Sequence, residues 1–158
     1  AILKNHYKNI TVFFGYTKDT VSEVALELFK TGRTNANDGG IDFVMRPVGR
    51  FFQVTEVNNY DKYLLDIDKV MHFPISFVIK TNKSKVNILK DLEKYILERS
   101  GGMAVLEERY KNAIEEITTI NELKTWIEEL NDNDIDNIIR DIDVYYRLEM
   151  NIEAQDDE

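Results

Sequence analysis

Hydrophobic positions follow two different periods along the chain, and the period changes where one predicted element gives way to the next. Four short stretches are β-prone, with apolar residues that alternate or run continuously. They are residues 9–14, 41–46, 51–58 and 75–79. The last stretch is largely apolar throughout, so we expect it in the interior of a sheet.

Helical spacing, with apolar residues at every third or fourth position, covers most of the remaining chain. Thr20-Val-Ser-Glu23 and Thr119-x-x-Glu122 have the form of capping boxes, and Ser84 is a typical N-cap residue. Gly32 and Gly101 mark two helix ends. The predicted helices lie within residues 20–31, 59–71, 85–100, 103–117, 120–130 and 135–146.

Pro47-Val-Gly-Arg50 separates two of the strands and predicts a tight turn, so residues 41–58 should form a β-hairpin. The order of elements is then helix, hairpin, helix, strand, helix and a final helical group. This order predicts an α/β (α+β) fold, with a central mixed sheet flanked by helices and a C-terminal helical segment.

Charge divides the chain into two parts. The length of 158 residues suits one domain, or one domain with a small appendage. The formal net charge of −9 at first argues against nucleic acid as a partner. However, residues 1–101 carry a net +3 and residues 102–158 carry −12, with the change at Ser100-Gly101-Gly102. We therefore expect an α/β core at residues 1–101 and an acidic helical appendage at residues 102–158, packed on the core or on a partner chain.

Composition excludes several kinds of chemistry. The chain has no cysteine, which removes disulfides, cysteine nucleophiles and cysteine-bound zinc. Its two histidines, His6 and His72, are too few for a multi-histidine metal site. No apolar run reaches the roughly 18 residues of a membrane span, and no signal-peptide pattern stands at the N-terminus. We therefore expect a cytoplasmic protein with no membrane partner.

Two acids mark the open end of the predicted hairpin. Asp42 opens the first strand and Glu56 lies near the end of the second. Acids on adjacent strands can point at a common spot, and a carboxylate pair suits Mg²⁺. Side-chain alternation places Glu56 and Asn58 on one face and Gln53 and Thr55 on the other. Only the first face supplies an acid, so we favour Glu56 and Asn58 as partners of Asp42. Gln53 and Thr55 are the alternative if a bulge shifts the register.

The order of helix, Gly40-Ile-Asp42 strand, turn, Glu56-x-Asn58 strand, helix and strand resembles the core of the PD-(D/E)xK nucleases. That superfamily includes type II restriction endonucleases and Mrr-like DNA-cleaving domains. The resemblance covers roughly residues 19–98 and implies a restriction-endonuclease-like core. It also implies a Mg²⁺-dependent endodeoxyribonuclease that hydrolyses phosphodiester bonds in DNA, with Asp42 and Glu56 as the metal ligands.

Further site residues follow from the same resemblance. Asn58 stands where the family most often has the lysine that positions or activates the attacking water. Lys62, about one turn into the following helix, would project back and substitute for that lysine. Family members also often carry an acid on the preceding helix, a place that Glu23 would fill.

Three arginines flank the hairpin and are the candidate contacts to DNA phosphates. They are Arg33, Arg46 and Arg50. The implied partners are double-stranded DNA and a homodimer or a larger restriction assembly. The alternative is a catalytically inactive nuclease fold that acts as an interaction or assembly module through its acidic helices. The missing motif lysine and the −12 segment favour this alternative.

Overall fold

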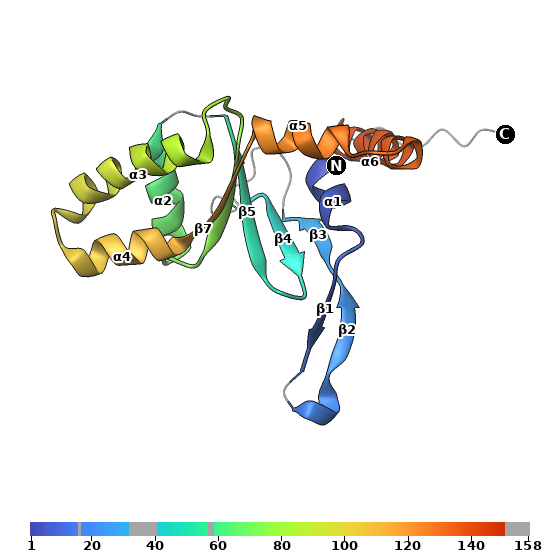
Figure 1. The fold of residues 1–158 in the computed structure, drawn as a ribbon, viewed down its shortest axis with the longest axis horizontal. Helices are drawn as coiled ribbons and strands as arrows, with labels where there is room; N and C mark the ends of the chain where they lie inside the picture. Colours follow the sequence, from blue (N-terminus) through green and yellow to red (C-terminus); the bar gives the residue numbers. More distant parts are fainter. Residues whose placement is uncertain (16, 32–40, 57–58, 151–158) are drawn as a thin grey trace.

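A five-stranded mixed sheet forms the centre of the computed structural model (Figure 1). The structure describes residues 1–15, 17–31, 41–56 and 59–150. The strand order is β3-β4-β5-β6-β7, antiparallel from β3 to β5 and parallel from β5 to β7. The strands are β3 (Glu27–Lys30), β4 (Phe43–Arg46), β5 (Arg50–Thr55), β6 (Ile75–Ile79) and β7 (Ile114–Thr119). The predicted mixed α/β fold is confirmed.

Helices cover both faces of this sheet. The first face carries α2 (Tyr60–Lys69), α3 (Lys85–Ser100) and α4 (Ala104–Ala113), which form the larger hydrophobic core with the sheet. The second face carries α1 (Ile2–Tyr7) and α5 (Ile120–Glu128) over a smaller core. All five residues of β6 are buried, as expected for an interior strand.

Strand register decides which face each β5 side chain meets. Gln53 and Thr55 pair with residues of β6 that lie in the larger core, so both point toward α2. Val54 pairs with Val78, which belongs to the smaller core on the opposite face. The alternation expected from the sequence is therefore confirmed within β5.

The prediction of a helix at residues 20–31 is wrong. A 3₁₀ turn at η1 (Lys18–Thr20) is followed by strand β2 (Ser22–Ala25) and then by β3. β2 pairs with β1 (Thr11–Phe14) in a separate two-stranded ribbon, which projects away from the sheet in Figure 1. A helix of this length is marginal by itself, and pairing with two neighbouring strands outweighs its helical spacing.

The prediction of a helix throughout residues 103–117 is also wrong. α4 ends at Ala113, and the next residues form β7 beside β6. Ile114, Ile117, Thr118 and Thr119 are β-branched, so they fit the sheet edge that β6 would otherwise leave open. The central sheet therefore contains a strand from each side of the predicted join at Gly101-Gly102.

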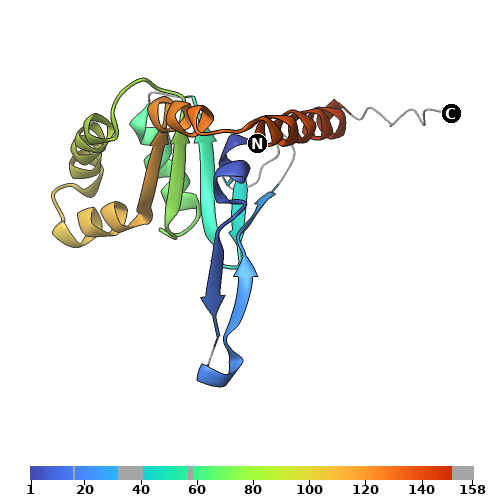
Figure 2. The same ribbon diagram turned by 45° about the vertical axis from the view of Figure 1, so that its right-hand side comes forward.

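The start and end of α3 and the start of α5 follow the sequence signals. The Ser84 side chain accepts a hydrogen bond from the backbone N–H of Asn87, and Gly101 ends α3 in the left-handed conformation with φ +59°. Thr119 and Glu122 form the predicted capping box of α5. The last helix, α6 (Asp132–Met150), runs out beyond the sheet (Figure 2). Among the helices that the structure describes, none combines the length and apolar character needed to cross a bilayer.

Candidate functional site

Asp42 lies at the open end of the β4–β5 hairpin. Its carboxylate Oδ2 accepts a hydrogen bond of 2.7 Å from the backbone N–H of Val54. Its own backbone N–H donates to the carbonyl of Phe52 at 2.9 Å. These two bonds fix the Asp42 carboxylate against β5, two residues before Glu56.

Glu56 directly follows β5, and its carboxylate Oε1 lies 3.1 Å from the ammonium of Lys80. Lys80 directly follows β6, and its backbone N–H donates to the carbonyl of Thr55 at 2.9 Å. Both side chains face solvent, with 74% of Glu56 and 63% of Lys80 exposed. The pair therefore joins the carboxyl ends of two parallel strands, the edge of an open α/β sheet where ligands usually bind.

Glu56 is contacted by Lys80 and not by Lys62, the lysine expected from the sequence. Lys62 lies in the first turn of α2, and its ammonium forms no ion pair with any residue that the structure describes. Lys80 contacts Glu56 instead, from the next strand of the sheet. Sequence reasoning missed Lys80, although three lysines within six residues directly after an apolar strand were a usable signal. They are Lys80, Lys83 and Lys85.

Glu23 does not join the site. It lies in β2 of the projecting ribbon, where its Oε1 accepts a hydrogen bond of 3.2 Å from the hydroxyl of Thr11. The expected preceding helix is a strand, so no helix carries an acid toward Asp42 from this segment. Asn58 and Arg33 lie outside the described residues.

The opposite face of β5 holds a buried polar group. Gln53 and Thr55 are almost fully buried beneath α2. The Gln53 side-chain oxygen Oε1 has no hydrogen-bond partner among the described residues. Burial raises the pKa of Tyr63 to about 12, although a hydrogen bond with Thr55 opposes the shift. Because side chains alternate along β5, this orphaned oxygen lies on the opposite face from Glu56 and does not extend the Glu56 site.

A second network extends the basic side of the site. The Lys83 ammonium lies 2.9 Å from the Asp91 carboxylate, which also accepts a hydrogen bond of 3.0 Å from the hydroxyl of Tyr60. The hydrogen bond with Lys83 lowers the pKa of Asp91, and the same bond raises the pKa of Lys83. This network fixes Lys83 near the end of β6, in the same loop as Lys80.

The described arginines lie at the other end of the hairpin. Arg50 begins β5, and Arg46 ends β4, four strand positions from Asp42 and thus about 13 Å away from it. Arg50 is already paired: its guanidinium lies 3.0 Å from Glu115 and 3.2 Å from Glu116. Arg46 is exposed and stacks over the ring of Phe29 at 5.4 Å. Arg46 therefore remains available to a phosphate, whereas Arg50 would first have to leave two glutamates.

Carboxylates are the candidate metal ligands at this edge of the sheet. Within the described residues, no group of three or more acidic or histidine side chains is placed to hold a metal ion. No protein-family model, curated protein or solved structure matches the chain.

Proposed function

We propose that this chain is a Mg²⁺-dependent endodeoxyribonuclease of the PD-(D/E)xK type, working in a restriction system. The contact between Lys80 and Glu56 carries the proposal, because it supplies a lysine beside the acid of the candidate motif. The motif itself has Asn58 at the lysine position. A lysine from the neighbouring strand would thus take over the role of the missing side chain.

The oxygen donors near Asp42 fit the proposed metal. Asp42 and Glu56 would hold it through their carboxylate oxygens. Mg²⁺ held by such oxygens stabilises negative charge on a phosphoryl group and makes a bound water more acidic. The Lys80 ammonium would hold the attacking water or a phosphate oxygen by a charge-assisted hydrogen bond.

DNA would approach the side of the sheet on which the parallel strands end. Lys80 and Lys83 lie in the loop that follows β6 and Lys85 begins α3, and these lysines would meet backbone phosphates without reading sequence. Arg46, about 13 Å along the hairpin, would contact a phosphate further along the duplex. Glu122 of the acidic segment lies 4.0 Å from Lys85 at this edge, so that lysine would partly screen its charge from the DNA.

A plasmid-nicking assay tests the proposal. Supercoiled DNA is incubated with the purified chain and Mg²⁺, and the Asp42→Ala/Glu56→Ala variant is compared with the wild type. Nicking that needs Mg²⁺ and disappears in the variant supports the assignment. A wild type that does not nick DNA, or a variant that nicks equally well, overturns it.

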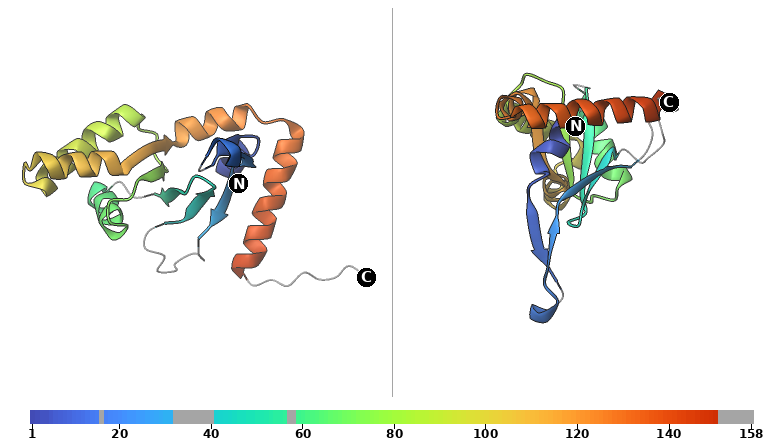
Figure 3. Two further views of the ribbon diagram at one scale, coloured as in Figure 1. Left: turned by 90° about the horizontal axis from the view of Figure 1, so that it is seen from below. Right: turned by 90° about the vertical axis from the view of Figure 1, so that its right-hand side faces the viewer.

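The second candidate is a non-catalytic assembly module, and an observation on α6 favours it. Large apolar side chains on this helix are exposed, although the helix is otherwise rich in acids. An assembly role does not exclude catalysis, because α6 lies on the β3 side of the sheet and away from β6 in Figure 3. The interaction module expected from the sequence would thus bind partners through the apolar side of its last helix.

A further inference from the structure

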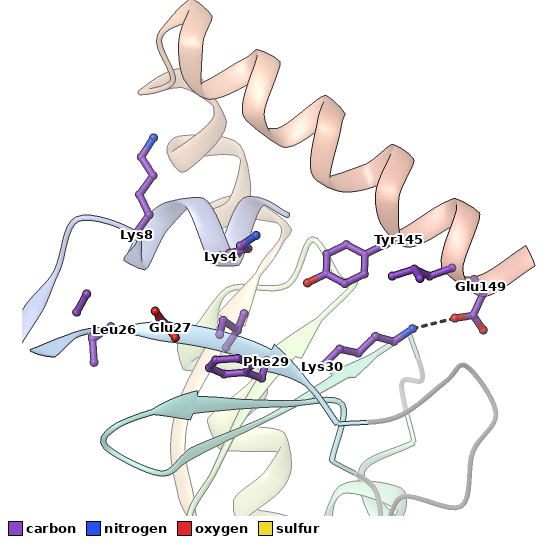
Figure 4. Close-up of a pocket in the computed structure, with 11 residues that line it drawn as sticks. Lys4, Lys8, Leu26, Glu27, Phe29, Lys30, Tyr145 and Glu149 are labelled. Atoms are coloured by element: carbon purple, nitrogen blue, oxygen red, sulfur yellow. Dashed lines mark hydrogen bonds and ion pairs between the residues drawn. The ribbon is translucent and has the colours of Figure 1, made fainter. Parts of the chain in front are cut away.

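The helix α6 turns three of its six acids toward the rest of the molecule. Three of its carboxylates pair with lysines of α1 and β3: Asp141 with Lys4 at 2.9 Å, Glu149 with Lys30 at 3.0 Å, and Asp134 with Lys8. Asp134 is the one buried residue of the helix. Figure 4 shows Tyr145 and Glu149 on this side, above β3 and across a groove of about 740 Å³. The contact of α6 with its own chain is therefore largely ionic.

The apolar stripe of α6 faces solvent instead. Its members follow one another at intervals of three or four residues and are each between 43% and 60% exposed. They are Ile135, Ile139, Ile142, Tyr146 and Met150. The first four have the 4-3-4 spacing by which helices pair. Branched and aromatic side chains at this spacing predict a second helix against the stripe.

The charges beside the stripe are complementary to the same charges on a second, antiparallel copy of α6. Asp136, Arg140, Asp143 and Arg147 lie on one flank of the stripe, at positions i, i+4, i+7 and i+11, with alternating sign. If a second α6 lies antiparallel, Asp136 faces Arg147 and Arg140 faces Asp143, and the two-fold axis repeats both pairs. A parallel copy in register would place each charge opposite its own kind. The pattern thus matches one orientation of one partner, the helix itself.

We propose that two copies of this chain form an antiparallel homodimer through α6, independently of the nuclease proposal. Lys4, Lys8 and Lys30 neutralise the three acids on the inner side. The other charges at the contact are two aspartates and two arginines, of which Asp143 and Arg147 also pair with each other along the helix at 2.8 Å. Because one helix pair makes a small interface, the dimer has a dissociation constant of about 10–100 μM.

Sedimentation velocity on the full chain tests the dimer. The wild type is measured up to about 500 μM, well above the expected dissociation constant. Ile139→Asp/Ile142→Asp is expected to weaken dimerisation by about tenfold or more, because it places four carboxylates in the apolar contact. The matched control is Leu97→Asp/Val105→Asp, which adds the same charges at exposed apolar positions of α3 and α4 and should still dimerise. A monomeric wild type, or a dimer that survives the α6 variant, overturns the proposal.

Charge-exchange variants distinguish specific pairing of two α6 helices from nonspecific association. Arg140→Glu/Arg147→Glu makes the flank wholly acidic, and Asp136→Arg/Asp143→Arg makes it wholly basic. Each variant by itself should dimerise less than the wild type, because like charges face each other. An equal mixture should form heterodimers at least as well as the wild type forms its dimer. Failure of the mixture to associate contradicts the proposed pairing.

Cysteine cross-linking fixes the orientation, since the chain has no cysteine of its own. The variants Ile135→Cys and Tyr146→Cys each place one thiol in the stripe, at its first and fourth positions. In an antiparallel pair, a mixture of the two variants forms a mixed disulfide, and each variant forms little disulfide with itself. The masses of the two variants differ, so mass spectrometry distinguishes the products. Self-disulfides without the mixed product would show a parallel dimer and overturn the antiparallel arrangement.

Discussion

Lys80 contacts Glu56 across the carboxyl ends of two parallel strands, with 3.1 Å between its ammonium and the carboxylate. The backbone fixes the same junction, because the N–H of Lys80 donates to the carbonyl of Thr55. An exposed ion pair of this kind adds little to folding stability. The pair therefore contributes little to the stability of the fold, and its role in the proposed cleavage can be tested with little effect on folding.

Removal of Lys80 should abolish most of the proposed DNA cleavage. Lys80→Ala is expected to lower the rate of Mg²⁺-dependent nicking by about 10²-fold, because a positioned charge beside the reacting phosphate is lost. The melting temperature should stay within about 4 °C of the wild type, since the ion pair is exposed. Lys62→Ala is the matched control, because the ammonium of Lys62 has no ion pair in the described part of the chain. Equal activity of Lys80→Ala and the wild type would contradict the role of Lys80.

The sequence predicted the hairpin, α2, β6 and the start of α3 because these segments carry local signals. Pro47 and Gly49 mark the turn, Ser84 caps a helix, and the run at 75–79 is apolar throughout. The prediction of a helix at residues 20–31 was wrong because the strands β2 and β3 form by pairing with β1 and β4, and no local pattern encodes that pairing. β7 was missed for the same reason, since its position depends on the open edge of β6.

The candidate site was predicted in part for a related reason. Asp42 and Glu56 are placed by one hairpin, so sequence spacing alone brings them to the same end. Lys80 directly follows β6 and lies 24 residues after Glu56 in the chain, and only the parallel pairing of β5 with β6 brings the two side chains together. The charge of Arg50 was visible in the sequence, but its neutralisation by Glu115 and Glu116 required β7.

A network around Asp68 should stabilise the packing of α2 against α3 and α4. Its carboxylate lies 2.7 Å from the Arg99 guanidinium and accepts a hydrogen bond of 2.8 Å from the hydroxyl of Tyr110. Arg99 also donates to the same hydroxyl at 3.1 Å. Asp68→Asn is expected to lower the free energy of unfolding by about 1 kcal/mol, discounted because the pair is partly exposed.

Urea unfolding followed by circular dichroism measures this loss. The control is Glu98→Gln, which makes the same carboxylate-to-amide change on the exposed side of α3. The control should alter the free energy of unfolding by less than about 0.5 kcal/mol. If both variants unfold at the same urea concentration, the network does not contribute to stability.

The buried tyrosine under β5 should make the fold sensitive to alkali. Burial raises the pKa of Tyr63 to about 12, whereas the unfolded chain has a tyrosine pKa near 10. A raised folded pKa means that the stabilising contribution is complete below pH 10 and disappears as pH rises through 12. Urea midpoints measured between these values should fall more steeply in the wild type than in Tyr63→Phe. Parallel curves for the two proteins would contradict this assignment.

The ion pair between Lys8 and Asp134 should make the attachment of α6 sensitive to acid. The hydrogen bond with Lys8 holds the pKa of Asp134 below its usual value. A lowered folded pKa means that the contribution is complete above the unfolded carboxyl value of about 4 and is lost as pH falls through the folded value. Amide chemical shifts of residues 132–150, followed by NMR from pH 6 downward, should therefore change toward those of a detached helix before the central sheet unfolds. Lys8→Met should show the shifts of the detached state already at pH 6, whereas Lys18→Met, with the same change in the projecting ribbon, should behave as the wild type. Identical pH profiles for wild type and Lys8→Met would mean that α6 is held by other contacts.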